Sequence, residues 1–362
     1  MNNRVDRLRS VMADQGIDLV VLGPGAHLAW LLGVRPHADE RPLLCCISAI
    51  DAGFLMPALE ADSARVQTDL PFYEWADDKG PADAFARLLS EFNVQKAKQI
   101  VLDETMRADF AWLVQSALPA AEIEFTLSSV GALRMCKEPD EYAALKQNAL
   151  LADRAMRAAW SRLKPGITEQ EVAAFARGSF ADHDAAMAFG IVGAGANGAF
   201  PHHHTGETRL AAGDAVVMDI GAGSLGYFSD ITRMAIIGRP PEGFTDVHAI
   251  VNAAVEAALA AAKPGVVASS VDAAARNVIE KAGYGEYFVH RTGHGLGTEI
   301  HEPPYITASS TTVLESGMVF SIEPGIYLPD RFGLRLEEIV ILRDNGPEVL
   351  SELPRDAFVA AA

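Results

Sequence analysis

One phrase of the sequence occurs twice, and this repeat limits the folds open to the chain. Residues 163–167 read Leu-Lys-Pro-Gly-Ile and residues 262–266 read Ala-Lys-Pro-Gly-Val, each followed by a helical pattern. Further along, residues 213–219 and 317–323 both run from a glycine through an apolar stretch to an acidic residue. Phrases repeated at matching places are typical of a duplicated structural unit. The later part of the chain is therefore predicted to consist of two related halves.

The part of the chain before the repeat has another pattern, in which short apolar runs alternate with helical segments. Strands are predicted at residues 19–22, 43–50, 99–103 and 122–127, and helices at residues 82–92 and 107–118. A long helix follows at residues 138–163, and another begins at a capping box of Thr168 and Glu171. We therefore predict a mixed α/β (α+β) protein with two domains, residues 1–132 and 133–362.

Composition and charge exclude several classes of protein. Apolar residues make up 49% of the chain, but no uninterrupted run approaches the roughly 18 apolar residues of a membrane span. A net charge of -18 would repel a phosphate backbone. Cys45, Cys46 and Cys136 fit neither a disulfide framework nor a Cys-x-x-Cys metal motif, and the first residues have the spacing of an amphipathic helix, not of a signal peptide. We expect a cytoplasmic protein that binds neither nucleic acid nor membrane.

Four acidic residues lie where the sequence predicts buried strands. Asp219 interrupts the apolar stretch 215–220, and Asp230 follows a turn-rich segment, so the two are predicted to face each other across a hairpin. Glu323 ends the apolar run 318–322, and Glu337 lies inside a predicted strand at residues 334–342. Because burying an unpaired carboxylate costs several kcal/mol or more, buried acids are usually neutralised, paired with a cation or bound to a metal.

A histidine between glycines completes this set. His294 lies in a His-Arg-Thr-Gly-His-Gly segment, where glycines allow close backbone approach and leave the imidazole facing a cleft. Each acid taken singly could instead be solvated or salt-bridged, and Arg335 could neutralise Glu337 on the same strand face. Arg233 and Arg335 cannot, however, neutralise four acids. Carboxylate and imidazole ligands suit two divalent ions about 3.5 to 4 Å apart.

These residues resemble the motifs of the pita-bread metallopeptidases, which include Xaa-Pro dipeptidases, Xaa-Pro aminopeptidases, methionine aminopeptidases and creatinase-like enzymes. The resemblance covers residues 130–350 and follows the order Phe200-Pro201-His202, Val217-Met218-Asp219-Ile220-Gly221, Tyr227-Phe228-Ser229-Asp230-Ile231-Thr232-Arg233, Gly293-His294-Gly295, Ile322-Glu323-Pro324-Gly325 and Arg335-Leu336-Glu337-Glu338. It implies a small creatinase-like α/β domain followed by a duplicated catalytic domain with a curved antiparallel sheet.

The resemblance also implies roles for single residues. Asp219 would chelate one metal, Asp230 and Glu337 would bridge two, and His294 with Glu323 would complete the second site, with a hydroxide between the ions. Glu323 would also pass a proton to the leaving nitrogen. The implied catalytic set further includes His202, His301, His290 and Arg335, whereas His203 and His204 are expected in a surface loop. The two divalent ions are expected to be manganese, with cobalt, zinc or iron as alternatives.

Among functions, the resemblance favours hydrolysis of the Xaa-Pro bond of dipeptides or short peptides. A metal-dependent hydrolase of a non-peptide amide and a non-catalytic protein-binding module are the alternatives. Residues 302–322 contain no arginine or lysine, although some dipeptidases of the family place there an arginine that grips the substrate carboxylate. Strict dipeptide specificity is therefore not expected. A homodimer is expected from the family alone.

Overall fold

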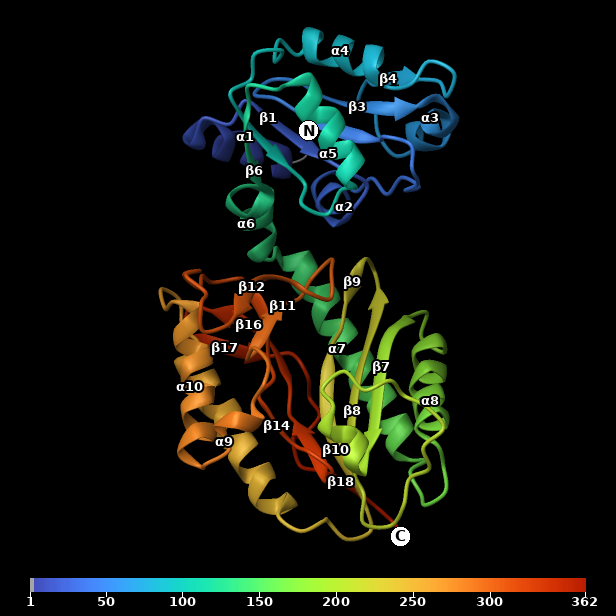
Figure 1. Ribbon diagram of the computed structural model, residues 1–362, viewed down its shortest axis with the longest axis vertical. Helices are drawn as coiled ribbons and strands as arrows, with labels where there is room; N and C mark the ends of the chain where they lie inside the picture. Colours follow the sequence, from blue (N-terminus) through green and yellow to red (C-terminus); the bar gives the residue numbers. More distant parts are fainter. Residues whose placement is uncertain (1–2) are drawn as a thin grey trace. The chain divides into compact units, whose positions relative to one another are not determined.

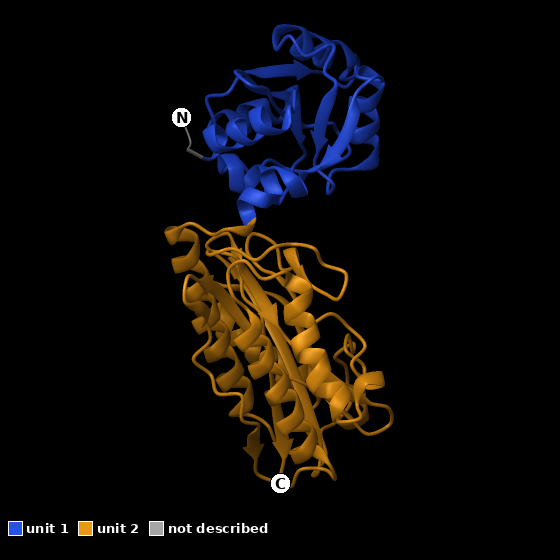
Figure 2. Cartoon of the chain, turned by 90° about the vertical axis from the view of Figure 1, so that its left-hand side faces the viewer, with its two compact units in different colours: residues 1–134 blue, residues 135–362 orange. Residues whose placement is uncertain are grey.

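The computed structural model describes residues 3–362. The chain divides into two compact units, residues 1–134 and residues 135–362 (Figure 2). The residues of each unit contact mainly one another. The predicted domain boundary after residue 132 stays a prediction.

The first unit is a six-stranded mixed sheet with helices on both faces. Its strands are β1 (Leu19–Leu22), β2 (Leu44–Ile47), β3 (Ala52–Pro57), β4 (Phe72–Trp75), β5 (Gln99–Leu102) and β6 (Glu122–Phe125), in the order β4-β3-β2-β1-β5-β6. The helices are α1 (Asn3–Gln15), α2 (Ala26–Leu32), α3 (Ala58–Arg65), α4 (Ala82–Glu91), α5 (Ala108–Ala117) and α6 (Val130–Met135), and Thr126–Ser128 forms a 3-10 turn.

Two apolar cores account for this arrangement. Residues of α1, α2 and α3 pack on one face of the sheet, and residues of α4 and α5 pack on the other. Strand β1 is buried on both faces, so it appears in the sequence as a continuous apolar run and not as an alternating one. The sequence did not predict β3 and β4.

The second unit surrounds two five-stranded sheets with four long helices. Its helices are α7 (Pro139–Trp160), α8 (Glu169–Ala181), α9 (Phe244–Ala261) and α10 (Ala268–Lys281), with 3-10 turns at Gly195–Ala199 and Gly285–Tyr287. Its strands are β7 (Ala186–Ala194), β8 (Ala215–Ser224), β9 (Tyr227–Phe228), β10 (Ile231–Ile237), β11 (Gly293–Gly295), β12 (Glu302–Ile306), β13 (Val319–Ile322), β14 (Gly325–Leu328), β15 (Phe332–Arg335), β16 (Glu338–Arg343), β17 (Gly346–Val349) and β18 (Phe358–Ala360).

The sheets lie between the helices in this unit. One sheet has the order β18-β10-β8-β7 with β9 on β8, the other has the order β12-β11-β13-β16-β17, and β14 pairs with β15. In Figure 1, α7 and α8 lie beside the first sheet, whereas α9 and α10 lie on the opposite side of the unit. The predicted arrangement of a small α/β domain before a larger mixed α/β domain is confirmed.

The internal repeat is visible in the backbone hydrogen bonds. Gly166 and Gly265 both adopt positive φ, at 87° and 85°, and their amides donate to Leu210 O and Leu314 O over 2.7 Å and 2.8 Å. Gly213 and Gly317 also match, with φ of 96° and 91°. Gly166 and Gly265 thus make equivalent turns before helices α8 and α10, and Gly213 and Gly317 make equivalent turns before strands β8 and β13. Glycine is favoured at all four because the backbone is left-handed there.

The predicted strand at residues 334–342 is wrong as a single element. Strand β15 ends at Arg335 and pairs with β14, whereas β16 begins at Glu338 and pairs with β13 and β17. Residues 336–337 form the passage between these sheets, so Glu337 lies at a break and not inside a strand. The apolar run is continuous because both strands are buried.

Helix α9 is the one helix of residues 3–362 that is long and apolar enough to cross a membrane by length and composition. It also carries Asp246, His248, Asn252 and Glu256, it is in contact with α10, and its buried residues include Val251. A core helix of a globular unit passes the same test, so this helix is weak support for a membrane span.

Candidate metal centre

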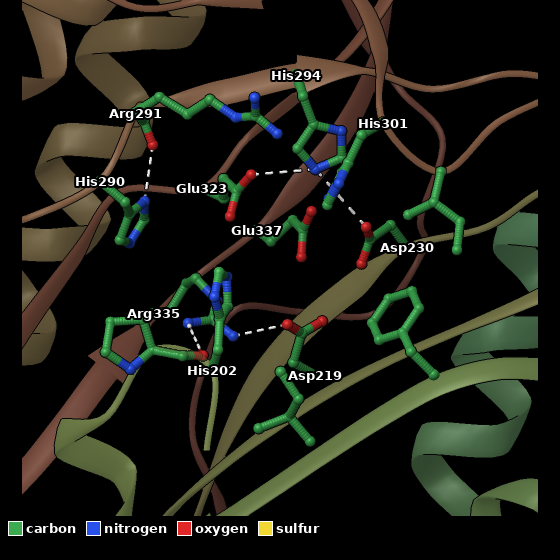
Figure 3. A pocket seen from close by; sticks show the side chains of 14 residues that line it. His202, Asp219, Asp230, His290, Arg291, His294, His301, Glu323, Arg335 and Glu337 are labelled. Atoms are coloured by element: carbon green, nitrogen blue, oxygen red, sulfur yellow. Dashed lines mark hydrogen bonds and ion pairs between the residues drawn. The ribbon is translucent and has the colours of Figure 1, made fainter. Parts of the chain in front are cut away.

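Strands of the two related halves, and the segments next to them, bring the predicted acids to one place. Asp219 lies within β8, and Asp230 immediately precedes β10, whose Thr232 is in register with Asp219. Glu323 follows the last residue of β13, and Glu337 lies in the passage between β15 and β16. Figure 3 shows Glu323 and Asp230 beside the imidazole of His294 from β11, Glu337 close to them, and Asp219 directed at Arg335.

The hydrogen bond at Nδ1 of His294 indicates which tautomer the neutral ring adopts, and therefore what Nε2 offers to its neighbours. Nδ1 lies 3.0 Å from Gly295 O, an oxygen that can only accept, so Nδ1 carries a proton. Nε2 lies 3.2 Å from Glu323 Oε1 and 3.8 Å from Asp230 Oδ2. In a neutral imidazole of this tautomer, Nε2 carries a lone pair that points at carboxylates. The contact is favourable only when the ring is an imidazolium or when a cation lies between these groups.

The carboxylates themselves show the same deficit of positive charge. Burial, followed by the charges of Glu337 and Asp219, raises the pKa of Asp230 well above its ordinary value. Burial, followed by the charges of Glu323 and Asp219, likewise raises the pKa of Glu337. Asp219 Oδ1 and Glu337 Oε1 are buried and have no hydrogen-bond partner in the described part of the chain.

Arg335 supplies only part of the missing charge. Its guanidinium donates to Asp219 Oδ2 at 2.6 Å and to Thr232 Oγ1 at 3.1 Å. The alternative in which Arg335 pairs with Glu337 is not adopted, because Arg335 pairs with Asp219 and Glu337 Oε2 accepts from Thr232 Oγ1 at 2.8 Å. Arg233 forms its ion pair with Glu338, at 3.1 Å, and not with any of the four acids.

The donor set therefore fits divalent cations. Asp230, His294 and Glu337 offer ligand atoms within 4.8 Å of one another. Carboxylate oxygens and an imidazole nitrogen are hard or intermediate donors, and two carboxylate oxygens lack any other partner. A cation would satisfy these oxygens and lower the repulsion that the buried acids now exert on one another.

A pocket of about 680 Å³ opens over this cluster, and the three histidines of the implied catalytic set, His202, His290 and His301, all line it. The His301 ring lies 4.2 Å from the His294 ring in a T-shaped contact. Burial, followed by the charges of His294 and Arg291, lowers the pKa of His301 to about 4. Burial also lowers the pKa of His290 to about 4, aided by the charge of Arg335. Both imidazoles are therefore neutral near pH 7.

His203 does not lie in a free surface loop as expected. Its Nε2 is 2.8 Å from Glu169 Oε2, and the Glu169 side chain is fully buried. Glu169 also accepts from the amides of Ala194 and Gly206 at 2.9 Å and 3.2 Å. This carboxylate at the start of α8 thereby holds the segment that carries His202. His204 is exposed.

Two residues of the pocket region were not predicted. Tyr327 OH lies 2.7 Å from both His290 Nε2 and Arg335 Nη1, so one buried hydroxyl links the two. Arg291 lines the pocket, and its guanidinium lies 4.8 Å from the Tyr305 ring. No ion pair joins Arg291 to a carboxylate within residues 3–362. The position of Arg291 inside the His-Arg-Thr-Gly-His segment was the available signal.

The first unit contains another group of potential ligands, His27, Asp103 and Glu104. Here Arg134 Nη1 lies 2.9 Å from His27 Nδ1, and an arginine can only donate. His27 Nε2 must therefore carry the ring proton, which it directs at Thr126 Oγ1 and Glu104 Oε1, 3.0 Å and 3.4 Å away. Both ring nitrogens of His27 are therefore engaged, and no imidazole lone pair is left for a cation.

The comparisons with known proteins agree with the fold and the site. The chain belongs to metallopeptidase family M24, whose sequence pattern matches residues 143–344, and residues 4–136 match the creatinase/prolidase N-terminal domain. It is an enzyme with the pita-bread fold, and its family uses divalent metal ions.

Individual relatives are similar over nearly their whole length. A probable dipeptidase PepE of Mycobacterium tuberculosis is 38% identical over 96% of this chain and 93% of its own. An Xaa-Pro dipeptidase of Pyrococcus horikoshii is 31% identical over 98% of this chain and 99% of its own. The crystal structure of dipeptidase PepE from Mycobacterium ulcerans superposes with a TM-score of 0.94 at 35% identity, covering 99% of this chain and 97% of that one.

Proposed function

We propose that this metallopeptidase hydrolyses the Xaa-Pro bond of short peptides, dipeptides above all, with two divalent cations. The convergence of Asp219, Asp230, His294, Glu323 and Glu337, with two buried carboxylate oxygens left unsatisfied, carries the proposal. These five side chains would hold the cations, and their carboxylate oxygens and imidazole nitrogen would supply the ligand atoms. Bound cations would lower the pKa of a water molecule and polarise the scissile carbonyl.

The protein's own residues would do the remaining work. Glu323, on the pocket side of the cluster, would take a proton and pass it to the leaving nitrogen. His202 and His301 would donate or accept hydrogen bonds at the reacting amide, and His301 is suited to this because its low pKa keeps it neutral. Arg335, hydrogen-bonded to Asp219 and Tyr327, would hold Asp219 in place beside the cations.

The pocket walls support a proline substrate. Phe189, Ile191, Pro201 and Ile300 give apolar surface beside the polar cluster. A pyrrolidine ring is apolar, and its tertiary amide has no N-H that would need a buried acceptor. The curated relatives named above as dipeptidases also support this substrate class.

Arg291 favours dipeptides over longer peptides. It is the cation of the pocket that has no carboxylate partner in the described part of the chain, so it is free to bind the C-terminal carboxylate of a two-residue substrate. The lack of arginine and lysine in residues 302–322 would then not prevent dipeptide binding, because the cation would come from residue 291.

The test compares peptides on chelator-stripped protein with and without restored manganese. We expect manganese-dependent cleavage of Ala-Pro, weaker cleavage of Ala-Pro-Ala, and none of Ala-Ala-Ala. Arg291→Met should raise the KM for Ala-Pro by about tenfold or more, yet leave that for Ala-Pro-amide nearly unchanged. If manganese binds but every proline peptide stays intact, the site acts on a different amide. A failure to turn over any amide would favour the protein-binding alternative.

We propose further that the protein is a cytoplasmic homodimer. The three cysteines are free, and Cys45 and Cys46 are buried in the first unit, which suits a reducing compartment. Light scattering that gives the mass of one chain would contradict the dimer.

A further inference from the structure

A buried carboxylate on α10 lies behind the metal-centre segments without belonging to them. Asp272 is 1% exposed and accepts from Thr292 Oγ1 at 2.8 Å and from Thr292 N at 3.2 Å. Both bonds end on the residue that immediately precedes Gly293 and His294. Asp272 therefore fixes the start of strand β11 by a side-chain contact and a backbone contact at once.

Arg276, one turn further along the same helix, extends this hold. Its guanidinium pairs with Asp272 at 3.2 Å and lies 4.2 Å from the Phe288 ring. It also donates to Phe288 O at 3.1 Å and to His290 O at 3.0 Å. A planar guanidinium with several donors can hold two carbonyls and one carboxylate together, which a lysine cannot reproduce.

The held segment is in direct contact with the cluster of acids. Thr292 O accepts from the backbone amide of Glu323 at 2.8 Å, so the residue that Asp272 grips also sets the backbone of a proposed metal ligand. His290 and Arg291 belong to the same segment. It runs from the Arg276 contacts at Phe288 and His290 to the Asp272 contact at Thr292. A shift at Thr292 would therefore move Glu323 and His294 together.

We propose that Asp272 and Arg276 are a positioning pair for the metal centre, acting through Thr292 on Glu323 and His294. Neither residue lines the pocket, and neither is predicted to touch substrate. Groups that orient metal ligands from behind typically change metal affinity or activity by 10–100-fold when they are removed. A pair that only stabilised α10 would change folding stability and leave metal affinity alone. The inference rests on the proposed metal site but not on the identity of the substrate.

The first unit offers a matched control. Asp103 is also 1% exposed, and it accepts from Thr105 N at 2.8 Å and from Thr105 Oγ1 at 2.6 Å. Asp103→Asn thus removes the charge from the same kind of contact on a carboxylate of the same burial, in the unit that holds none of the proposed ligands. Asp272→Asn and Asp103→Asn can be compared at equal folding stability, adjusted with temperature.

The primary measurement is manganese affinity of stripped protein by equilibrium dialysis, without substrate. We expect Asp272→Asn to weaken binding by about tenfold or more and Asp103→Asn to change it less than about twofold. For Ala-Pro, Asp272→Asn at saturating manganese should lower kcat by about tenfold while KM changes little. Equal manganese affinity in the two variants would overturn the inference.

Thr292 provides a second route if Asp272→Asn does not fold. Thr292→Ser keeps the hydroxyl that donates to Asp272 and should bind manganese as the parent does, whereas Thr292→Val keeps the shape and should weaken binding. Equal affinity of the Ser and Val variants would also contradict the positioning role. If the parent binds manganese but cleaves no Xaa-Pro peptide, the proposed function fails, yet the dialysis comparison still decides this inference.

Discussion

At the scale of single residues, the proposed metal centre is a set of buried acidic side chains whose surroundings disfavour their negative charge. Asp230 and Glu337 are buried together, and the pKa of each is raised by burial and by neighbouring carboxylates. The protein without metal therefore retains a destabilising cluster, which is the cost of having ligands ready for a cation. Fully hydrogen-bonded acids such as Glu169 show the contrasting case in the same unit.

Glu337→Gln should separate stability from function. A raised folded-state pKa means that the stabilising contribution of Glu337 is present below its unfolded pKa of about 4.5 and is lost as pH rises through the folded value. At pH 7.5 the metal-free Gln variant should therefore be more stable than the parent by about 1 kcal/mol or more, with the gain vanishing toward pH 4. Manganese binding and activity should be lost. Urea unfolding of stripped protein measures this.

Glu169→Gln is the matched control for that experiment, because Glu169 is equally buried but accepts hydrogen bonds on both oxygens. Glu169→Gln should destabilise the protein at pH 7.5, because the N–H group of the new side-chain amide would face one of the donors that the Glu169 carboxylate now accepts from. A destabilising Glu337→Gln variant would contradict the view that the metal-free cluster is repulsive.

His290 should make stability fall in acid. Its pKa is lowered to about 4, so its contribution is fully present above the unfolded pKa of about 6.5 and is lost as pH falls through 6.5 toward 4. Relative to His290→Gln, which can still accept from Tyr327, the parent should lose about 3 kcal/mol between pH 7.5 and pH 4. Urea unfolding of both stripped proteins at a series of pH values gives the difference. Parallel curves for the two proteins would show that His290 does not titrate with folding.

At the scale of elements, glycines with positive φ begin the strands that carry the acids. Gly213 and Gly317 have φ of 96° and 91°, and they precede the strands that lead to Asp219 and Glu323. The space beside Gly213 is open, so an added methyl group would meet no neighbour and only the backbone conformation would resist it.

Gly213→Ala should therefore destabilise the protein by about 1 kcal/mol or slightly more through backbone strain alone. Gly178, exposed within α8 and equally free of neighbours, is the control: Gly178→Ala should stabilise by about 0.5–1 kcal/mol. Thermal unfolding of both variants gives the comparison. A neutral Gly213→Ala variant would show that the turn tolerates a side chain there.

At the scale of the whole molecule, the two units have separate cores and one unit holds all the proposed ligands. The apolar clusters of the first unit contain no residue of the second. Metal binding should therefore stabilise residues 135–362 by mass action, by about 2.7 kcal/mol at a free concentration of a hundred times Kd.

Hydrogen exchange can locate this effect. When manganese is added to stripped protein, exchange should slow in β8, β10, β13 and β16, and the strands of the first unit should be unchanged. Calcium, which prefers more oxygen ligands than this set offers, is the control ion. Uniform protection of both units would contradict separate stabilisation.

The sequence by itself determined the parts that local chemistry dictates. Acids inside apolar runs, a histidine between glycines, and a Lys-Pro-Gly phrase used twice each leave a signal within a few residues, so the family and the class of metal site could be predicted. The strand β1 and the helices α7 and α8 were predictable for the same reason, since apolar period and capping boxes are local.

Only the tertiary structure decided which charges meet. Arg335 lies two residues from Glu337 yet pairs with Asp219, because its strand β15 turns away into another sheet before β16 begins. The residues next to Tyr327 and Asp272 in the sequence do not indicate their roles. Each contacts a residue of another segment that only the packing of the elements brings close. Pairing across distant elements depends on the whole arrangement of sheets and helices, which no short stretch of sequence contains.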